Sequence, residues 1–100
     1  MARFIAEKFQ EDIATEDIAR AAGLHPNYAM ALFRRRCGLT LHDYLLQYRL
    51  TRAQQLLLTT DDKVVDVALG SGFGSVSTFY ELFVRKLKIT PIKFRRRMRS

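Results

Sequence analysis

The sequence predicts an all-α fold of about seven helices, and three observations indicate it. Apolar residues recur at helical intervals along the chain, as Phe4, Ile5 and Phe9 do near its start. No stretch alternates apolar and polar residues as a half-buried strand would. The chain is 48% hydrophobic, which is ordinary for a folded globular domain, and its glycines and prolines stand where helices are expected to end or begin.

The first two helices are short. The first is expected around residues 4–9, where apolar side chains fall on one helical face. Thr15 is a suitable N-cap for the second, because two acidic residues follow it in the first turn. This second helix is expected to reach about Ala22. Gly23 then suits the left-handed backbone that follows many helix ends.

The third and fourth helices are longer. Pro26 fits the first turn of a third helix, which runs to Cys37 and stops at Gly38. Thr40 is expected to cap a fourth helix, which meets no Gly or Pro before about Thr59. About 20 helical residues make a rod of about 30 Å. The fourth helix is therefore the longest element that the sequence predicts.

The last three helices each follow a polar capping residue. The expected caps are Asp61 or Asp62 for the fifth helix, Ser75 for the sixth and Thr90 for the seventh. The fifth helix should end near residues 70–72, and the sixth should reach about Lys88. Pro91 opens the seventh, which carries the terminal arginines.

An internal repeat organises these helices. At an offset of 49 residues, 17–19 matches 66–68 and 22–24 matches 71–73; at an offset of 50, Leu32-Phe33 matches Leu82-Phe83, Leu39-Thr40 matches Ile89-Thr90 and Tyr44 matches Phe94. Each copy predicts a short helix, a glycine turn and a longer helix, which is the helix-turn-helix pattern. The sequence thus predicts two such units, over 1–38 and 61–100, joined by a linker helix over 39–60.

The charge distribution favours a polyanionic partner. The chain has 17 Lys and Arg against 10 Asp and Glu, a net charge of +7. Residues 1–62 balance to zero, whereas residues 63–100 hold nine basic and two acidic side chains. Such an excess indicates nucleic acid first and an anionic membrane surface second. The alternative is that the runs 34–36 and 95–97 are ordinary solvated helix faces.

Several other classes are excluded or disfavoured. No apolar run approaches the roughly 18–20 residues of a membrane span. One Cys permits no internal disulfide, and with two His it does not make a structural zinc site. Cys37, His25 and His42 form no catalytic set, so neither enzyme activity nor a cofactor or metal is expected. We predict that Cys37 is a small core residue, with a redox thiol as the alternative.

Two outward helix faces are candidates for contact with DNA. The second helix of such a motif enters the major groove, while its apolar stripe packs on the first helix. The predicted stripes are Ala29, Leu32, Phe33 and Cys37 in the first unit, and Phe79, Leu82, Phe83 and Leu87 in the second. On the outward faces, Asn27 could bond an adenine edge and Glu81 could accept from a cytosine amino group. Met30, Ala31 and Val76 offer only apolar contact, for example to a thymine methyl group.

Phosphate contacts are expected elsewhere. Helix N-termini present free N–H groups to anions, and Thr40 and Thr90 start helices at matching positions of the repeat. The predicted phosphate-contacting residues are His25, Arg34, Arg35, Thr40, Ser75, Thr78, Lys86, Thr90 and Lys93. Such contacts fix affinity and register but read no sequence.

These residues resemble the DNA-binding domain of the AraC/XylS family of bacterial transcription regulators, over about residues 4–99. The matching positions are Ile18-Ala19, Pro26, Tyr28 and Phe33, then Asp66-Val67-Ala68, Gly72-Phe73, Ser77, Phe79, Phe83, Thr90-Pro91, Phe94 and Arg95. The resemblance implies a homeodomain-like fold of seven helices with two helix-turn-helix subdomains. It also implies that Asn27, Met30, Ala31, Val76, Ser77 and Glu81 contact bases.

The chain departs from the family pattern at four positions. The family often has Arg where Ala31 stands, so a typical guanine contact is missing. Val84 stands where the family usually has a basic residue. Lys88 replaces the family's usual Gly, and Ala29 replaces its usual Leu. Lys88 would then hold a left-handed backbone at some cost or shift the turn by a residue. The affinity for DNA should therefore depend mainly on contacts with the charged DNA backbone and on DNA shape.

The resemblance also implies partners. The expected function is sequence-specific binding to double-stranded promoter DNA, with two recognition helices in successive major grooves, and activation through RNA polymerase. The chain has no room for an effector-binding domain, so we expect the excised C-terminal part of a larger cytoplasmic, nucleoid-associated regulator; a stand-alone short member is the alternative. The alternative function is a basic helical module that binds nucleic acid nonspecifically or an acidic protein.

Overall fold

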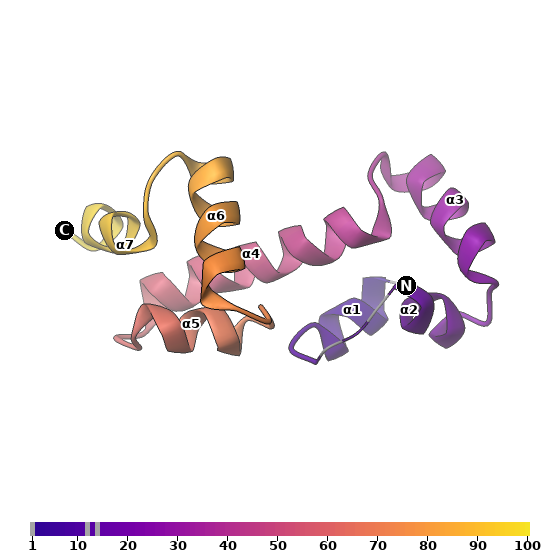
Figure 1. The fold of residues 1–100 in the computed structure, drawn as a ribbon, viewed down its shortest axis with the longest axis horizontal. Helices are drawn as coiled ribbons and strands as arrows, with labels where there is room; N and C mark the ends of the chain where they lie inside the picture. The colour runs from indigo at the N-terminus through magenta and orange to yellow at the C-terminus, as the bar shows by residue number, and fades with distance from the viewer. Residues whose placement is uncertain (1, 12, 14) are drawn as a thin grey trace. The chain divides into compact units, whose positions relative to one another are not determined.

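Seven helices make up the described part of the chain, residues 2–11, 13 and 15–100, in a computed structural model (Figure 1). They are α1 (Ala2–Lys8), α2 (Thr15–Ala21), α3 (Pro26–Cys37), α4 (Leu41–Thr59), α5 (Val64–Gly70), α6 (Val76–Leu87) and α7 (Pro91–Arg99). These residues contain no strand, which confirms the predicted all-α class. Within the same described ranges, no helix is both long and apolar enough to cross a membrane. The predicted cap by Thr15 depends on a side chain that lies outside the described part of the structure.

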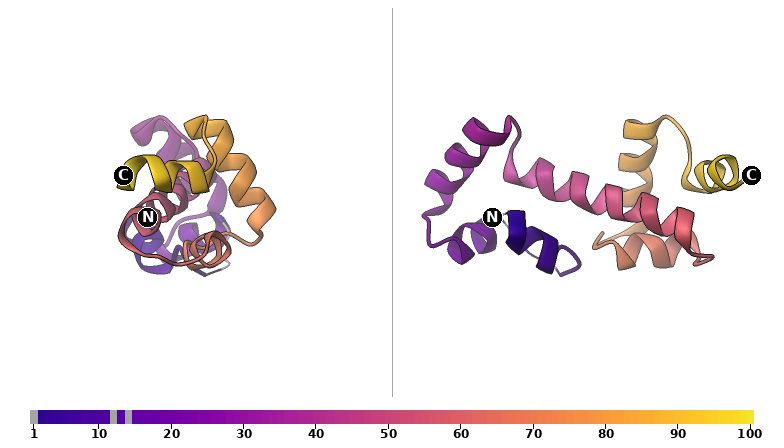
Figure 2. Two further views of the ribbon diagram at one scale, coloured as in Figure 1. Left: turned by 90° about the vertical axis from the view of Figure 1, so that its left-hand side faces the viewer. Right: turned by 180° about the vertical axis from the view of Figure 1, so that it is seen from behind.

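The chain divides inside α4, into unit 1 (Met1–Tyr48) and unit 2 (Arg49–Ser100). The first part of α4 belongs to unit 1 and the second part to unit 2. In each unit a short helix packs against a longer one, α2 on α3 and α5 on α6. The longer helix crosses the shorter one steeply, as Figure 1 and the reverse view in Figure 2 show for α5 and α6. This crossing leaves one face of α3 and one face of α6 without a helical neighbour in its own unit.

Unit 1 is built on one apolar cluster. Its buried members are Ile5, Phe9, Ile18, Ala19, Ala29, Phe33, Leu41 and Leu45. Aromatic rings join the helices, because Phe9 contacts Tyr48 at a centroid distance of 5.0 Å and Phe33 contacts Tyr44 at 5.2 Å. The start of α4 therefore forms part of the core that holds α3 in place.

Unit 2 has a core richer in phenylalanine. Rings of four buried Phe residues follow one another at centroid distances of 5.2, 5.5 and 5.5 Å, in the order Phe73, Phe79, Phe83 and Phe94. The other buried apolar residues of the unit are Leu50, Ala53, Leu57, Val67, Ala68, Leu82 and Pro91. The first and third ring pairs are edge-on and the second is tilted, and such aromatic pairs add about 0.5–1.5 kcal/mol each beyond simple burial. The chain of rings links the α5–α6 turn, α6 and α7.

The turns of the two units share the same glycine position and the same returning hydrogen bond. Gly23 has φ +72° and Gly72 has φ +97°, so both hold the left-handed backbone after a helix end. The next residue of each turn donates its N–H back into the helix, from Leu24 to Ala19 (2.9 Å) and from Phe73 to Ala68 (3.1 Å). The predicted glycine stop at the end of α2 is confirmed. Unit 2 differs by one added residue, Gly74, before its next helix.

The predicted cap of the fifth helix is wrong. The N-cap of α5 is Lys63, whose side chain makes no capping hydrogen bond, and neither Asp61 nor Asp62 caps the helix. Both aspartates belong to the preceding loop instead. The Asp61 carboxylate accepts from the Arg99 guanidinium at 2.8 Å, and the Asp62 N–H donates to Thr60 Oγ1 at 3.3 Å. The helix thus starts one or two residues later than predicted, and the Asp61 carboxylate binds a side chain of α7 instead of the helix N-terminus.

The prediction that Cys37 is a core residue is also wrong, because its side chain is exposed. On α3 the unit 1 core covers Ala29 and Phe33, while Leu32 is half-buried. Cys37 is the last residue of α3, one turn beyond Phe33, where the helix end extends past the cluster. Helical spacing placed Cys37 on the correct face but did not show how far the core extends.

Lys88 holds a strained backbone. Its φ is 61° and ψ 25°, the one positive φ among the non-glycine residues that the structure describes; Gly38 ends α3 in the same way with φ 78°. A left-handed backbone costs an ordinary residue about 1–2 kcal/mol. Lys88→Gly should therefore raise the free energy of unfolding by about 1 kcal/mol, measured by urea denaturation followed by circular dichroism.

The matched control for Lys88→Gly changes the same residue type inside the helix. Lys86→Gly in α6 should lower stability by about 0.5–1 kcal/mol, because glycine weakens a helix interior. Equal losses from both substitutions would contradict the strain assigned to Lys88.

Candidate nucleic-acid interface

The two longer helices of the units, α3 and α6, have twelve residues each and bury the same face. Phe33 and Phe83 are buried at matching positions of the repeat, as are Ala29 and Phe79. Leu82 is also buried, whereas its counterpart Leu32 is only half-buried. The opposite face of each helix is thereby exposed to solvent.

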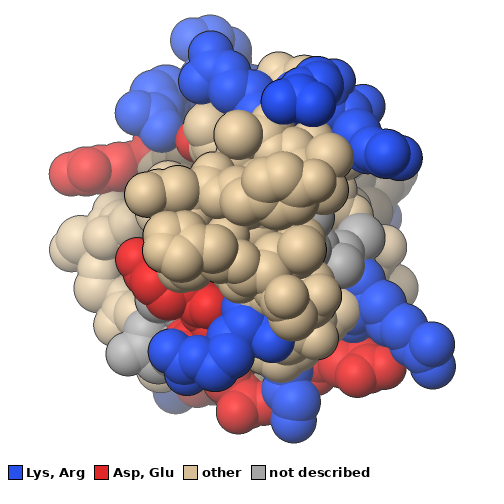
Figure 3. Space-filling model, turned by 90° about the vertical axis from the view of Figure 1, so that its right-hand side faces the viewer, with Lys and Arg blue, Asp and Glu red and all other residues tan. Residues whose placement is uncertain are grey.

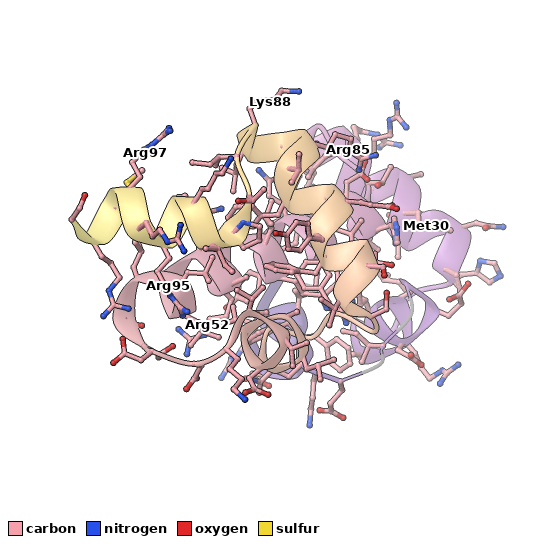
Figure 4. All side chains as sticks on the ribbon, turned by 60° about the vertical axis from the view of Figure 1, so that its left-hand side comes forward. Met30, Arg52, Arg85, Lys88, Arg95 and Arg97 are labelled. Carbon is pink, nitrogen blue, oxygen red and sulfur yellow. The ribbon has the colours of Figure 1, made fainter. Side chains whose placement is uncertain are left out.

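Most of the residues predicted to contact bases lie on these exposed faces. Asn27 and Ala31 are exposed on α3, and Ser77 and Glu81 are exposed on α6. Met30, labelled on α3 in Figure 4, is half-buried and packs partly against the unit 1 core. Val76 is half-buried as well, at the start of α6. In each unit the structure brings two exposed candidates and one half-buried candidate onto a single helix.

Side chains cap both helices at their N-termini. His25 Nδ1 accepts the N–H of Asn27 at 3.3 Å, and Ser75 Oγ accepts the N–H of Thr78 at 3.1 Å. The Ser75 hydroxyl also donates to Thr78 Oγ1 at 2.9 Å. Ser75 therefore uses its hydrogen within the cap, while the Thr78 hydroxyl hydrogen stays available to a ligand. With Nδ1 as the acceptor, the neutral His25 ring carries its hydrogen on Nε2.

Two further threonine caps follow the same repeat. Thr40 Oγ1 accepts the N–H of Asp43 at 3.0 Å, and Thr90 Oγ1 accepts the N–H of Lys93 at 3.3 Å. Both caps were predicted, and both threonines are half-buried. The first turn of α4 carries Asp43, whereas the first turn of α7 carries Lys93 and no acidic residue. The N-terminus of α7 is the more favourable of the two for an anion.

The basic candidates are exposed, and the ion pairs of the described residues involve other side chains. Among the residues that the structure describes, the ion pairs are Arg3–Glu7, Lys8–Glu11, Arg20–Asp17 and Arg99–Asp61. The predicted phosphate contacts Arg34, Arg35, Lys86 and Lys93 appear in none of these pairs. Figure 3 shows many Lys and Arg side chains at the surface, interspersed with fewer Asp and Glu.

Arg95 is a residue whose role the sequence did not reveal. Its guanidinium donates to three backbone carbonyls, at 3.0 Å to Leu57, 3.1 Å to Thr60 and 2.7 Å to Asp62. Figure 4 shows Arg95 directed from α7 toward the loop after α4, while Arg97 points away. The repeat held a signal for this inward position, because the counterpart of Arg95 is the buried Leu45.

The described residues contain no group of three His, Cys, Asp or Glu side chains that could hold a metal ion. The arrangement offers instead two helix faces with polar and apolar groups, bordered by helix N-termini and cations. A helix fits the major groove of B-DNA, where such groups reach base edges.

A family model described as a helix-turn-helix domain matches residues 18–97. The structure is also similar to an AraC-type DNA-binding domain protein from Chromobacterium violaceum, with a TM-score of 0.89 and 30% identity over 97% of this chain and 87% of that chain. The chain belongs to the AraC-type helix-turn-helix family. A further AraC-type likeness is the DNA-binding domain of AdpA, solved in complex with a target DNA, with a TM-score of 0.93 and 28% identity over 98% of this chain and 88% of that chain.

Curated relatives of this AraC-type domain are regulatory proteins. The melibiose operon regulatory protein of Escherichia coli K12 is 35% identical over 96% of this chain, and the chain spans 32% of that protein. The regulatory protein SoxS of the same strain is 32% identical over 95% of this chain, which spans 89% of SoxS. The chain thus covers about a third of the first relative and most of the second.

Proposed function

We propose that this AraC-type domain binds double-stranded DNA sequence-specifically and regulates transcription, with α3 and α6 as its recognition helices in successive major grooves. The observation that carries the proposal is the duplicated unit, in which each longer helix is anchored on one face and exposed on the other. The likeness to the AdpA domain, which was solved with a target DNA, supports it.

We assign base contacts to the exposed helix faces. In this assignment Asn27 bonds an adenine edge, and Glu81 accepts from the amino group of cytosine. Ser77 can donate or accept. The apolar contacts come from Met30, Ala31 and Val76. None of these six residues is an arginine, so we propose that base readout alone gives modest affinity.

Phosphate contacts supply the remaining affinity in this proposal. The helix N-termini capped by Thr40 and Thr90 face DNA phosphates in this proposal. The Thr78 hydroxyl and the His25 Nε2–H donate to neighbouring phosphates. Ser75 acts through the cap that orients Thr78. The cationic contacts are Arg34, Arg35, Lys86 and Lys93.

Selection of bound duplexes from a random DNA pool at physiological salt tests the proposal. Two short conserved blocks about one helical turn, or about 34 Å, apart are expected. A single block would mean that one unit reads bases and the other holds the backbone. No enrichment would favour the alternative, a basic module that binds nucleic acid nonspecifically or an acidic protein.

Glu81→Ala should change sequence preference more than nonspecific affinity. Loss of the carboxylate removes the acceptor for a cytosine amino group, so discrimination at one base pair should fall by about 1–3 kcal/mol. Binding to the selected duplex and to single-base variants of it measures this effect. An equal loss on every sequence would contradict the placement of Glu81 at the base edges.

Arg34→Ala should weaken binding to all duplexes alike. One phosphate contact fewer lowers the slope of log affinity against log salt by about one. The control is Arg3→Ala, which removes an α1 cation already paired with Glu7 and should leave the slope unchanged. The same slope in wild type and Arg34→Ala would remove Arg34 from the phosphate contacts.

We further propose that the domain is the DNA-binding part of a larger, effector-responsive activator in the bacterial cytoplasm. The melibiose operon regulatory protein, of which the chain spans 32%, supports this view. The effector would bind a domain outside this chain, and the chain itself would need neither cofactor nor catalysis. We also propose that the chain is divided into two helix-turn-helix units, over 1–38 and 61–100, with a linker helix over 39–60.

RNA polymerase is the proposed protein partner. Unit 2 has a surface unsuited to DNA on α5, where Val65, Asp66 and Leu69 are exposed, the two apolar residues at 46% and 53%. An apolar surface with a carboxylate suits a basic protein. Asp66→Ala should reduce transcription activation in vitro while operator affinity is unchanged. Equal activation by both proteins would remove this surface from the contact.

A further inference from the structure

Two apolar side chains stand exposed on α6, the helix that carries Glu81. Tyr80 and Val84 are each 37% exposed and lie one helical turn apart. Val84 is also three residues beyond Glu81, so the three side chains are neighbours on one helix surface. An exposed apolar pair beside a carboxylate is unexpected on a helix that is proposed to meet a polyanion.

The matching positions in unit 1 are different. The counterpart of Val84 is Arg34, an exposed cation, and the counterpart of Tyr80 is Met30, which is half-buried against its core. Unit 2 has therefore replaced a side chain able to bind phosphate with one that can make only apolar contacts. If α6 lies in the major groove, an apolar side chain at this position is best matched by an apolar group of the DNA.

The edges of the bases offer one such group in the major groove, the C5-methyl group of thymine. We propose that Tyr80 and Val84 recognise thymine methyl groups beside the base pair read by Glu81. The inference rests on the proposed function and deepens it, because it names the chemistry of the second half-site. Arg85, Lys86 and Lys88 are exposed at the end of the same helix, and this positive charge favours DNA over a second copy of the chain as the occupant.

Deoxyuridine substitution isolates the methyl group, because uracil keeps every hydrogen-bonding group of thymine. The probe is the duplex recovered from the random pool, with each thymine replaced in turn by deoxyuridine. The half-site of α6 is the one at which Glu81→Ala loses discrimination. Removal of one contacted methyl group should weaken binding about fourfold, from about 0.8 kcal/mol per buried carbon group.

The protein side of the test is Val84→Ala, whose side chain is exposed and whose removal leaves the buried core intact. With this variant, deoxyuridine at the contacted thymine should cost less than twofold, because the partner of the methyl group is already gone. As a control, deoxyuridine in the half-site of α3 should have the same effect on both proteins. Tyr80→Ala should act in the same way at a neighbouring thymine.

The outcomes separate the two proposals. If the duplex is bound specifically but no thymine of the second half-site changes affinity by more than twofold, the inference is wrong and the proposed function stands. The inference is also wrong if deoxyuridine weakens binding equally in wild type and in both variants. Loss of specific binding to every selected duplex would overturn the proposed function itself.

Discussion

Phe83→Ala is expected to lower the free energy of unfolding by about 3–5 kcal/mol, the usual cost of removing a buried phenylalanine. Phe83 is fully buried and contacts the rings of Phe79 and Phe94, each at a centroid distance of 5.5 Å. The substitution removes the ring that connects α6 to α7 and leaves a cavity between them. Urea denaturation followed by circular dichroism measures the loss.

A conservative variant distinguishes packing from general disruption. Phe83→Leu retains part of the buried volume and should cost clearly less than Phe83→Ala. Tyr80→Ala on the exposed face of α6 should change stability by no more than about 0.5 kcal/mol. A loss below about 1 kcal/mol for Phe83→Ala would show that Phe83 does not support the unit 2 core. DNA affinity should fall with stability, because the exposed face of α6 depends on its buried face.

Arg95→Ala is expected to cost about 3 kcal/mol, from three hydrogen bonds of about 1 kcal/mol each. The guanidinium satisfies the carbonyl of Leu57 in the last turn of α4 and those of Thr60 and Asp62 in the loop that follows. Its positive charge also lies at the negative end of the α4 dipole. The same denaturation experiment tests the effect.

Two variants check that the geometry of the guanidinium is responsible. Arg95→Lys keeps the charge but cannot donate to three carbonyls in a plane, so it should recover only part of the loss. Arg97→Ala removes an exposed arginine that points away from the loop and should be close to neutral. Equal effects of Arg95→Ala and Arg97→Ala would contradict the role assigned to Arg95.

Local signals in the sequence predicted most helix ends correctly, and the repetition of the same short motifs in both units supported each prediction. Ser75, Thr40 and Thr90 cap helices as predicted, and Gly38 ends α3 with a left-handed backbone. Lys88 showed the same principle, because a residue matched to a glycine in the repeat does hold a positive φ. Caps and turns depend on a few neighbouring residues, so a single sequence is sufficient to place them.

The features that the sequence did not predict depend on distant partners. Asp61 is an excellent cap by type, but its carboxylate instead accepts a hydrogen bond from Arg99, 38 residues away. Cys37 lies on the correct helix face, yet the core ends before it. Arg95 belongs to a run of arginines, and its tertiary contacts distinguish it from Arg96 and Arg97. Its buried counterpart in the repeat, Leu45, was the one sequence signal for this inward position. Within the candidate site, the half-burial of Met30 was missed for the same reason.

The exposed face of each recognition helix has a consequence for evolution. Asn27, Ala31, Ser77 and Glu81 are exposed, while buried residues and the side-chain caps of His25 and Ser75 hold their helices. Mutations at these four positions can therefore accumulate with little penalty to folding. A protein with two such units can therefore keep the base preference of one recognition helix while the other helix evolves a preference for a new promoter sequence.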